Sequence, residues 1–356
     1  MIKIVKKVEP THRQEMVMRL SAVVFALVAS ALVMAVMGYN PVQIFSELFK
    51  GALATKYRFQ QTINKTIPLV VLSLGVSVAF KMKFWNIGAD GQMYMGAFGA
   101  SYVALYHQNL PMGVMIPAMM LSAFLWASFW ALIPALLKVK FSTSETLVTL
   151  MLNYIATMWI SYLQYGPWKD PEGIGFPKIA TFVKAAILPK VFGVHIGWII
   201  ALVLVVLVHI LLKYSKLGYE IAVLGESETT ARYAGINVVK TTLIAVIISG
   251  GLCGLAGMMQ ASAIEHTLND QLSGGLGFTA VITTWLAQLS APAVVVVSFL
   301  FAMLLQGGVF LQSALQIPSS MAEVLQGIII FFVLGSEFFI RYNLVFEKKK
   351  NREEAR

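Results

Sequence analysis

Long apolar runs separated by short polar segments dominate this chain. A helix that crosses a bilayer needs about 20 mostly apolar residues, and runs of this length predict ten spans with soft edges. They lie at 18–38, 64–82, 86–107, 111–137, 144–165, 195–213, 241–262, 272–289, 292–314 and 320–340. The eighth is the weakest, because it is short and starts in the glycine-rich stretch SGGLG, so a full span and a re-entrant segment both stay open. The pattern predicts an all-α integral membrane protein.

Composition leads to the same class of protein. Of the 356 residues, 58% are hydrophobic and 12% are charged, and the mean hydropathy is +0.75. Soluble domains carry about 25% charged residues. The first apolar run is long enough to stay as a helix, and no small-residue cleavage site follows it, so we expect no cleaved signal peptide.

The positive charges set the expected topology. An even number of spans places both ends of the chain on one side, and the tails 1–19 and 341–356 are rich in Lys and Arg. The positive-inside rule therefore assigns both tails to the cytoplasm, and most of the 27 Lys and Arg residues then fall inside. The segment 40–63 is discordant, because it places basic residues outside, and a surface helix in the membrane interface would explain it. No basic soluble domain offers a nucleic-acid groove, so nucleic acid is not an expected partner.

The connection outside the membrane at 166–195 is long enough to bind another protein. It is rich in Pro, Gly and Lys, and we expect it to be the docking surface for an external partner. Its counterpart on the inside, 214–240, mixes acidic, basic and small residues and is typical of a helix with a turn.

Within the inside connection, Ala231 and Gly235 are four residues apart and are therefore expected on one helix face. Glu228 and Arg232 flank this small-residue face as a charge pair. A short helix of this kind can pass a push from a cytoplasmic motor into the membrane. A solvated loop helix without a partner explains the same residues.

Polar residues near the start of the third span are candidates for a permeation path. The stretch NIGADGQ places Asn86, Asp90 and Gln92 where unsatisfied polar atoms are expensive. Asn153 and Tyr154 of the fifth span are further candidates. A broken helix that lines an aqueous path would explain these positions, and so would a helix start capped by Asn86 and Asp90.

Small residues form one face of the seventh span. Gly250, Gly254 and Gly257 fit a helix-packing face, and the first two match the GxxxG pattern. The single cysteine, Cys253, lies in the same stretch and is expected to be a packing residue. A faint internal repeat pairs the glycine-rich stretch after span two with the one around span eight, and transporters often have such related halves.

Several chemistries lack their sequence motifs. The chain contains no GxxxxGK[ST] phosphate loop and no HExxH, CxxC or GxSxG sequence. We therefore expect no cofactor or metal, and any ATP hydrolysis would belong to a partner chain. The spans lack the string of acidic and basic residues that proton-coupled carriers use. The five histidines are scattered along the chain, which disfavours a membrane enzyme.

Sequence blocks in a fixed order resemble the permease subunits of the simple-sugar and nucleoside branch of bacterial ABC importers, relatives of the ribose and branched-chain amino acid permeases. NIGADGQ is similar to the family signature NIGAEGQ, with Asp90 where Glu is usual. MLNYI followed by GPWKDP and GFP, then ARYAGI, then SGGLCGLAG resemble further family blocks. The inside connection lacks the full EAA signature of classical importers, because Thr229-Thr230-Ala231 stands where Glu-Ala-Ala would be. The chain also departs from the family at Thr283-Thr284-Trp285, where small, aliphatic residues are usual.

The resemblance implies a single permease domain, 1–356, with the ten-helix fold of type II importers, in a multi-pass protein of the bacterial cell membrane. Its expected partners are a cytoplasmic ABC ATPase that binds ATP and Mg, a second permease of the same or a homologous chain, and an extracellular substrate-binding lipoprotein. The expected cargo is a nucleoside or related sugar-containing solute, moved by alternating access. Riboflavin or another vitamin, a simple sugar and, outside the family, ion-coupled secondary transport are the alternatives.

Overall fold

The computed structural model describes residues 2–6, 12–173, 175–317, 324, 327–328, 331–332, 335–336 and 342–346. Most of the predicted tenth span, 320–340, lies outside these residues. Each earlier predicted span contains a helix, so the all-α prediction is confirmed.

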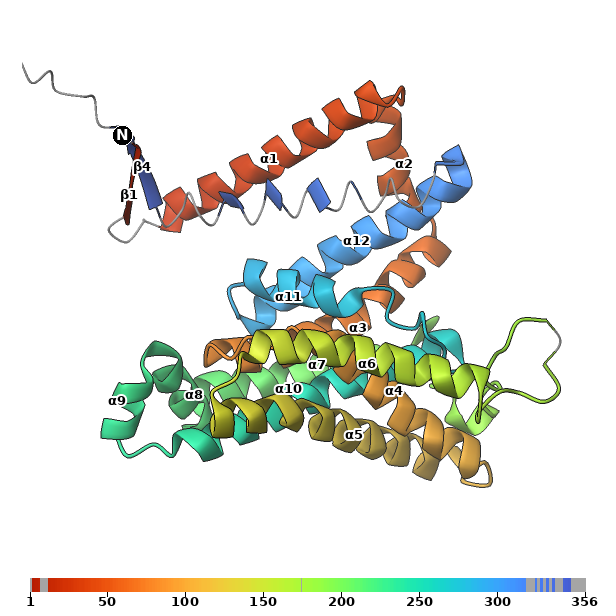
Figure 1. Ribbon diagram of the computed structural model, residues 1–356. Coiled ribbons are helices and arrows are strands. Elements are labelled where there is room, and N and C mark those ends of the chain that lie inside the picture. Colours follow the sequence, from red (N-terminus) through yellow and green to blue (C-terminus); the bar gives the residue numbers. More distant parts are fainter. Residues whose placement is uncertain are drawn as a thin grey trace, which may run out of the picture. The chain divides into compact units, whose positions relative to one another are not determined.

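The elements follow one another along the chain as Figure 1 labels them. The helices are α1 (His12–Val36), α2 (Pro41–Leu53), α3 (Lys56–Lys81), α4 (Ala89–Tyr106), α5 (Met112–Phe141), α6 (Glu145–Tyr165), α7 (Gly197–Tyr214), α8 (Lys216–Glu226), α9 (Glu228–Tyr233), α10 (Val238–Gln260), α11 (Leu276–Leu286) and α12 (Ala291–Leu315). A 3₁₀ turn covers Lys184–Ala186, and a π-helical turn, Ala261–Glu265, extends α10. The short strands are β1 (Ile2–Lys6), β2 (Lys190–Val191), β3 (Val194–His195) and β4 (Tyr342–Phe346).

Several helices have the length and apolarity of membrane spans. Within the described ranges these are α3, α5, α6, α7, α10 with its π-helical extension, and α12. In contrast, α11 has 11 residues and rises about 16 Å, roughly half of a 30 Å hydrocarbon core. The weak eighth span is therefore a short helix, and Gly274 and Gly275, both at positive φ, turn the chain into it.

The described residues form two compact units. Unit one contains 1–52 and 304–356, and unit two contains 53–303. In unit one, β1 and β4 pair antiparallel, with Ile2 opposite Phe346, so the two ends of the chain lie side by side (Figure 1). This pairing requires both ends to lie on the same side of a membrane.

Helix α2 occupies most of the segment whose charges are discordant. The chain turns by 117° between Val24–Val36 and Pro41–Leu53. A small apolar core joins α1, α2 and the end of α12, and consists of Met34, Ile44, Leu311 and Ile317. The position of α2 in the membrane interface stays a prediction.

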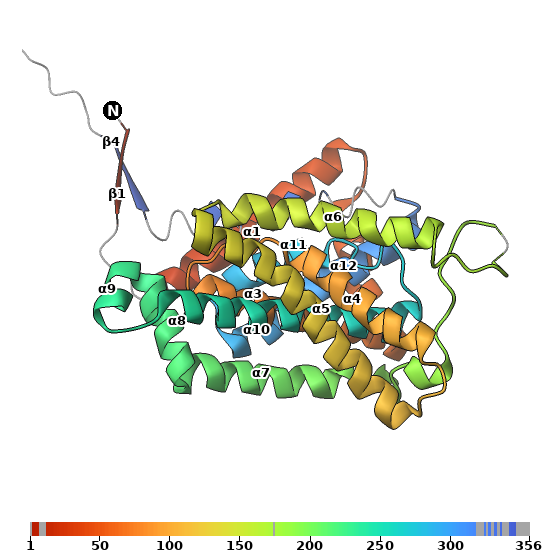
Figure 2. The ribbon, with the colours of Figure 1, turned by 60° about the horizontal axis from the view of Figure 1, so that its bottom comes forward.

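Helices α3 and α10 are the buried centre of unit two. Every residue of α3 from 66 to 80 is buried, so this helix meets protein on all sides rather than lipid. Helix α10 packs on α3, α4 and α5, and the two ribbon views show these helices running through the same bundle (Figures 1 and 2).

Glycines let the backbones around α10 approach closely. A Cβ at Gly250 would overlap Ala131 of α5, and a Cβ at Gly254 would overlap the Ala123 carbonyl. A Cβ at Gly257 would overlap the carbonyl oxygen of Met93 in α4. The small-residue face of α10 thus lies against α4 and α5.

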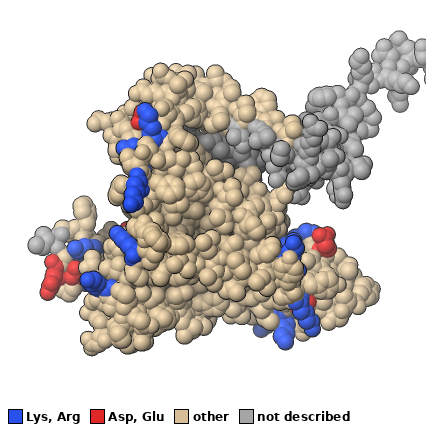
Figure 3. Space-filling view, turned by 180° about the vertical axis from the view of Figure 1, so that it is seen from behind, with Lys and Arg blue, Asp and Glu red and all other residues tan. Residues whose placement is uncertain are grey.

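The two ends of unit two differ. Both ribbon views place α8 and α9 at one end and the connection 166–195 at the opposite end (Figures 1 and 2). Charged side chains gather toward two opposite edges of the face in Figure 3 and leave the middle of that face uncharged. An uncharged band between two charged ends is the surface expected of a membrane-spanning bundle.

Candidate functional site

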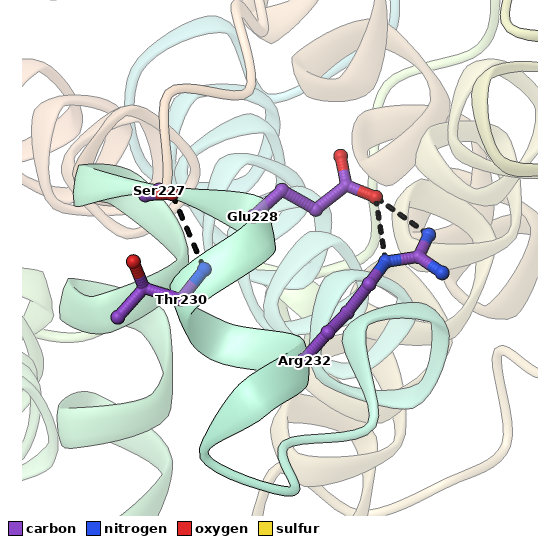
Figure 4. Close-up of polar contacts among 4 residues, drawn as sticks. All are labelled: Ser227, Glu228, Thr230 and Arg232. Atoms are coloured by element: carbon purple, nitrogen blue, oxygen red, sulfur yellow. Dashed lines mark hydrogen bonds and ion pairs between the residues drawn. The ribbon is translucent and has the colours of Figure 1, made fainter.

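Two polar regions of unit two hold the predicted site residues: the short helix α9, and the stretch 86–92 in the middle of the bundle. Helix α9 is defined at both ends by capping. The Ser227 side chain accepts a hydrogen bond from the Thr230 N–H at 3.2 Å (Figure 4), which caps the N-terminus. At the other end Gly235 has φ +75°, and the Ile236 N–H donates to the Ala231 carbonyl at 3.0 Å, which is a Schellman ending.

Glu228 and Arg232 form an exposed ion pair on α9. Arg232 Nη2 lies 2.7 Å from Glu228 Oε1, and Arg232 Nε donates to the same oxygen at 3.3 Å (Figure 4). Their side chains are 59% and 68% exposed, respectively. Such a pair contributes little to folding, so its charges are available to a partner.

The prediction that Ala231 and Gly235 share one helix face is wrong. The helix ends at Tyr233, and Gly235 is part of the turn that follows. Ala231 is fully buried and anchors α9, whereas Glu228, Thr229, Thr230, Arg232 and Tyr233 are exposed. The accessible surface of α9 is therefore charged and polar. The coupling role of these residues stays a prediction.

Helix α8 ties α9 to the spanning helices. A Cβ at Gly225 would overlap the Lys81 carbonyl at the end of α3, so the two backbones touch. The Thr241 hydroxyl, in the first turn of α10, donates to Glu220 Oε2 of α8 at 2.9 Å. A displacement of α8 and α9 would therefore reach the ends of α3 and α10, the two most buried helices of the unit.

A cavity of about 380 Å³ lies beside α9, and it is lined by residues of α5, α6, α8, α9, α10 and the α3–α4 connection. Glu228 and Arg232 line it together with a second ion pair, Lys138 Nζ to Glu145 Oε2 at 2.9 Å. The Glu145 side chain is only 9% exposed. Sequence reasoning missed Lys138, although two opposite charges that flank the short α5–α6 turn are a signal for such a pair.

The stretch 86–92 forms a closed hydrogen-bond network in the middle of the bundle. Asn86 Nδ2 donates to Gln92 Oε1 at 3.0 Å, and Gln92 Nε2 donates back to Asn86 Oδ1 at 2.9 Å. Asn86 Nδ2 also donates to Ser249 Oγ of α10 at 3.1 Å, and the Gly88 N–H donates to Asn86 Oδ1. Asn86 is fully buried, so these contacts satisfy polar groups that water cannot reach.

Asn153 of α6 is bound to the same stretch. The Gly91 N–H donates to Asn153 Oδ1 at 2.8 Å, and Asn153 Nδ2 donates to the Ile87 carbonyl at 2.9 Å. The next residue, Tyr154, points elsewhere: it is 61% exposed and lines a surface pocket of α6 with Trp159 and Tyr162. The structure thus brings Asn153 to the stretch and leaves Tyr154 outside.

Asp90 joins α4 to the short helix α11. Its Oδ1 accepts the Gly277 N–H at 2.8 Å and the Ser273 hydroxyl. The helix starts of α4 and α11 therefore meet at one carboxylate, and helix N-termini favour negative charge. Sequence reasoning missed Ser273 and Gly277 as partners, although the faint repeat pairs the two glycine-rich stretches that meet here. The pathway role of Asn86, Asp90, Gln92, Asn153 and Tyr154 stays a prediction.

The far end of unit two contains a buried histidine. His195, in the β2–β3 hairpin, is 2% exposed, and neither ring nitrogen has a hydrogen-bond partner among the described residues. Burial, with a smaller contribution from the positive charge of Lys190, lowers the pKa of His195 to about 4. In the part of the chain that the structure describes, no group of three His, Cys, Asp or Glu residues is placed to hold a metal ion.

Comparison with known proteins assigns the family. The model of the permease component of the branched-chain amino acid transport system matches residues 59–334. The glucose ABC transporter permease protein TsgB13 of Haloferax volcanii is 29% identical over 344 residues, which cover 92% of this chain and 90% of that protein. The guanosine ABC transporter permease protein NupP of Bacillus subtilis is 29% identical over 336 residues, 93% of this chain and 96% of that protein. The nucleoside ABC transporter permease protein NupB of Lactococcus lactis is 27% identical over 347 residues, 94% of this chain and 95% of that protein.

The matched region contains α9, the stretch 86–92 and the short helix α11. The relatives are similar over nearly their whole length, and the apolar helices have the span of a bilayer. The chain therefore belongs to the permease-component family of branched-chain amino acid transport systems and is a multi-pass membrane subunit of an ABC importer.

Proposed function

We propose that this chain translocates a nucleoside or a related sugar-containing solute, and that a separate cytoplasmic ATPase drives it through α9. The observation that carries the proposal is the exposed, charged α9 tied through α8 to the ends of α3 and α10. A partner that binds α9 and moves it would displace the most buried helices of the unit. The relatives named for guanosine, nucleoside and glucose transport support the cargo class.

In this mechanism ATP and Mg bind to the partner ATPase. Closure of that ATPase pushes on Glu228 and Arg232, and unit two rearranges between outward- and inward-facing states. Asn86, Asp90, Gln92 and Asn153 are the polar groups within the bundle that a passing solute would meet when their network opens. A second permease chain, alike or different, completes the membrane part, and an extracellular binding lipoprotein delivers cargo to the end that holds 166–195.

In this proposal the chain ends and the α8–α9 end of unit two face the cytoplasm, and the 166–195 end faces outward. The β1–β4 pairing holds the chain ends together, and the basic tails favour the cytoplasm. The α8–α9 end belongs on that same side by the charge pattern, which leaves 166–195 outside. A riboflavin or other vitamin permease is a cargo alternative with the same mechanism, whereas an ion-coupled carrier would need no ATPase.

Transport by the purified complex tests the proposal. A tag on this chain would recover it with its native partners, and the complex would be reconstituted into proteoliposomes with its binding protein. We expect uptake of guanosine, ribose, glucose or riboflavin only when the ATPase can hydrolyse ATP. Uptake that proceeds without ATP, driven by an ion gradient, would overturn the proposal.

A further inference from the structure

The connection between α3 and α4 and the short helix α11 are fastened together at two points of different chemistry. Near one end of α11, Asp90 accepts hydrogen bonds from Ser273 and Gly277. At the other end, the indole rings of Trp85 and Trp285 stack, with centroids 5.4 Å apart and an angle of 17° between the planes. We call this contact between the α3–α4 connection and α11 the seam.

The polar end of the seam has an unused acceptor. Both donors bind Asp90 Oδ1, and Oδ2 has no hydrogen-bond partner among the described residues. Asp90 also forms no ion pair within the part of the chain that the structure describes. An asparagine would accept the same two hydrogen bonds without the cost of a charge within the membrane. The two helix starts favour the negative charge of Asp90, and its second oxygen can still accept hydrogen bonds, which a solute with adjacent hydroxyl groups would donate.

At the aromatic end of the seam, Trp85 and Trp285 lie on different elements, and both rings also pack against Phe80 of α3, with centroids 5.2 Å and 5.9 Å from its ring. Trp285 lies on α11, where the Thr284 hydroxyl donates to the Ser73 carbonyl of α3 at 2.9 Å. Trp85 lies in the non-helical connection, and 36% of it is exposed. Displacement of Trp85 would open a slot between two indole planes. Planar aromatic rings of other molecules stack on such faces.

The two ends of the seam differ in chemistry and lie at opposite ends of α11. Gly277 and Trp285 are eight residues apart on α11, which is about 12 Å along the helix axis. A solute that engages both ends therefore needs a hydroxyl-bearing part and a planar aromatic part. A hexose would engage Asp90 and leave the aromatic end unused, and a free base would do the reverse.

We propose that the seam is a two-part cargo subsite, in which Asp90 accepts hydrogen bonds from ribose hydroxyls and Trp85 and Trp285 stack on the base. The cargo is then a nucleoside rather than a hexose. This inference rests on the proposed importer function and adds to it the class of solute and the residues that distinguish it.

Leucine substitution of Trp85 in the reconstituted complex tests the aromatic end. Trp126→Leu is the matched control, because Trp126 is 40% exposed and also contacts an aromatic ring, Phe98, but lies on α5 away from the seam. Uptake of labelled guanosine per ATP hydrolysed should fall by at least about tenfold in Trp85→Leu and stay near the wild-type value in Trp126→Leu. Trp85→Phe keeps a planar ring and should restore most of the uptake.

Asp90→Asn tests the polar end, because it keeps both internal hydrogen bonds and removes only the carboxylate. Guanosine uptake should fall while the melting temperature stays within the range of the control variants. Equal effects of Trp85→Leu and Trp126→Leu, or unchanged uptake in Asp90→Asn, would overturn the inference. ATP-driven uptake of glucose without guanosine by the wild-type complex would overturn it as well and leave the importer function intact. Failure of every tested solute in the presence of ATP would instead refute the proposed transport function.

Discussion

The centre of unit two and its α9 end are both rich in polar residues, but the polar side chains are buried at the centre and exposed on α9. At the centre, Asn86 and Gln92 are buried and bind each other and the backbone. On α9, Glu228 and Arg232 are mostly exposed and bind each other alone among the described residues. Buried amides hold a structure in one arrangement because leaving them unpaired is costly. Exposed charges cost little to rearrange, so they suit a surface that a partner engages and releases.

Close helix packing at the centre should dominate stability. A Cβ at Gly257 would overlap the Met93 carbonyl, which is backbone and cannot swing aside. Gly257→Val should therefore destabilise the protein by about 1–3 kcal/mol or more, measured by thermal unfolding in detergent. Gly113→Val is the control, because a Cβ there meets nothing within 4 Å. Equal unfolding temperatures for the two variants would contradict the packing described for α10.

His195 extends the comparison to a buried side chain that has no hydrogen-bond partner within the described part of the chain. Its pKa is about 4 in the folded protein and about 6.5 when unfolded, so between these values the unfolded chain alone binds the proton. The contribution of neutral His195 to the free energy of unfolding is thus fully present above about pH 6.5. It falls by about 1.4 kcal/mol per pH unit as the pH drops toward 4. His195→Phe should remove this part of the acid sensitivity. The check is the difference in melting temperature between wild type and variant at pH 7 and pH 5; a constant difference would refute the explanation.

The hydrogen bonds of Asn153 test whether the polar network at the centre holds α6 to the 86–92 stretch. Asn153→Leu removes both partners of the 86–92 stretch on α6 and leaves the Gly91 N–H and the Ile87 carbonyl unpaired. We expect a loss of about 1–3 kcal/mol. The neighbouring exposed Tyr154 provides the control, since Tyr154→Leu should change stability by about 0.5 kcal/mol or less. If both variants unfold alike, the network does not hold α6 to the stretch.

The two ion pairs beside the 380 Å³ cavity should differ in how much they stabilise the fold, with the nearly buried pair contributing more than the exposed pair. Lys138→Met leaves the nearly buried Glu145 without its cation and should cost about 1–2 kcal/mol. Arg232→Met affects a pair that is exposed on both sides and should cost about 0.5 kcal/mol or less. Urea or thermal unfolding of the two variants decides the matter, and a larger loss for Arg232→Met would reverse the assignment of which pair is structural.

The sequence predicts the helices well because bilayer-length apolar runs are a local property. The ends of α9 are local too, since Ser227 and Gly235 are a capping residue and a terminating glycine in one short segment. In contrast, the partners of Asp90 lie more than 180 residues away, and no local pattern specifies such a contact. The helix-face argument for Ala231 and Gly235 failed because it assumed a helix longer than the Gly235 turn permits. The shortness of α11 was signalled by its glycines, but its contact with the 86–92 stretch was not.

Charge reversal on α9 tests the central claim most directly. The complex carrying Arg232→Glu would be compared with wild type in proteoliposomes, with guanosine uptake and ATP hydrolysis measured on the same vesicles. The account predicts a normally folded protein in which uptake per ATP hydrolysed is nearly abolished, because α9 can no longer pass the movement of the ATPase to α3 and α10. Unchanged uptake per ATP in a folded Arg232→Glu complex would contradict the claim that α9 is the coupling element.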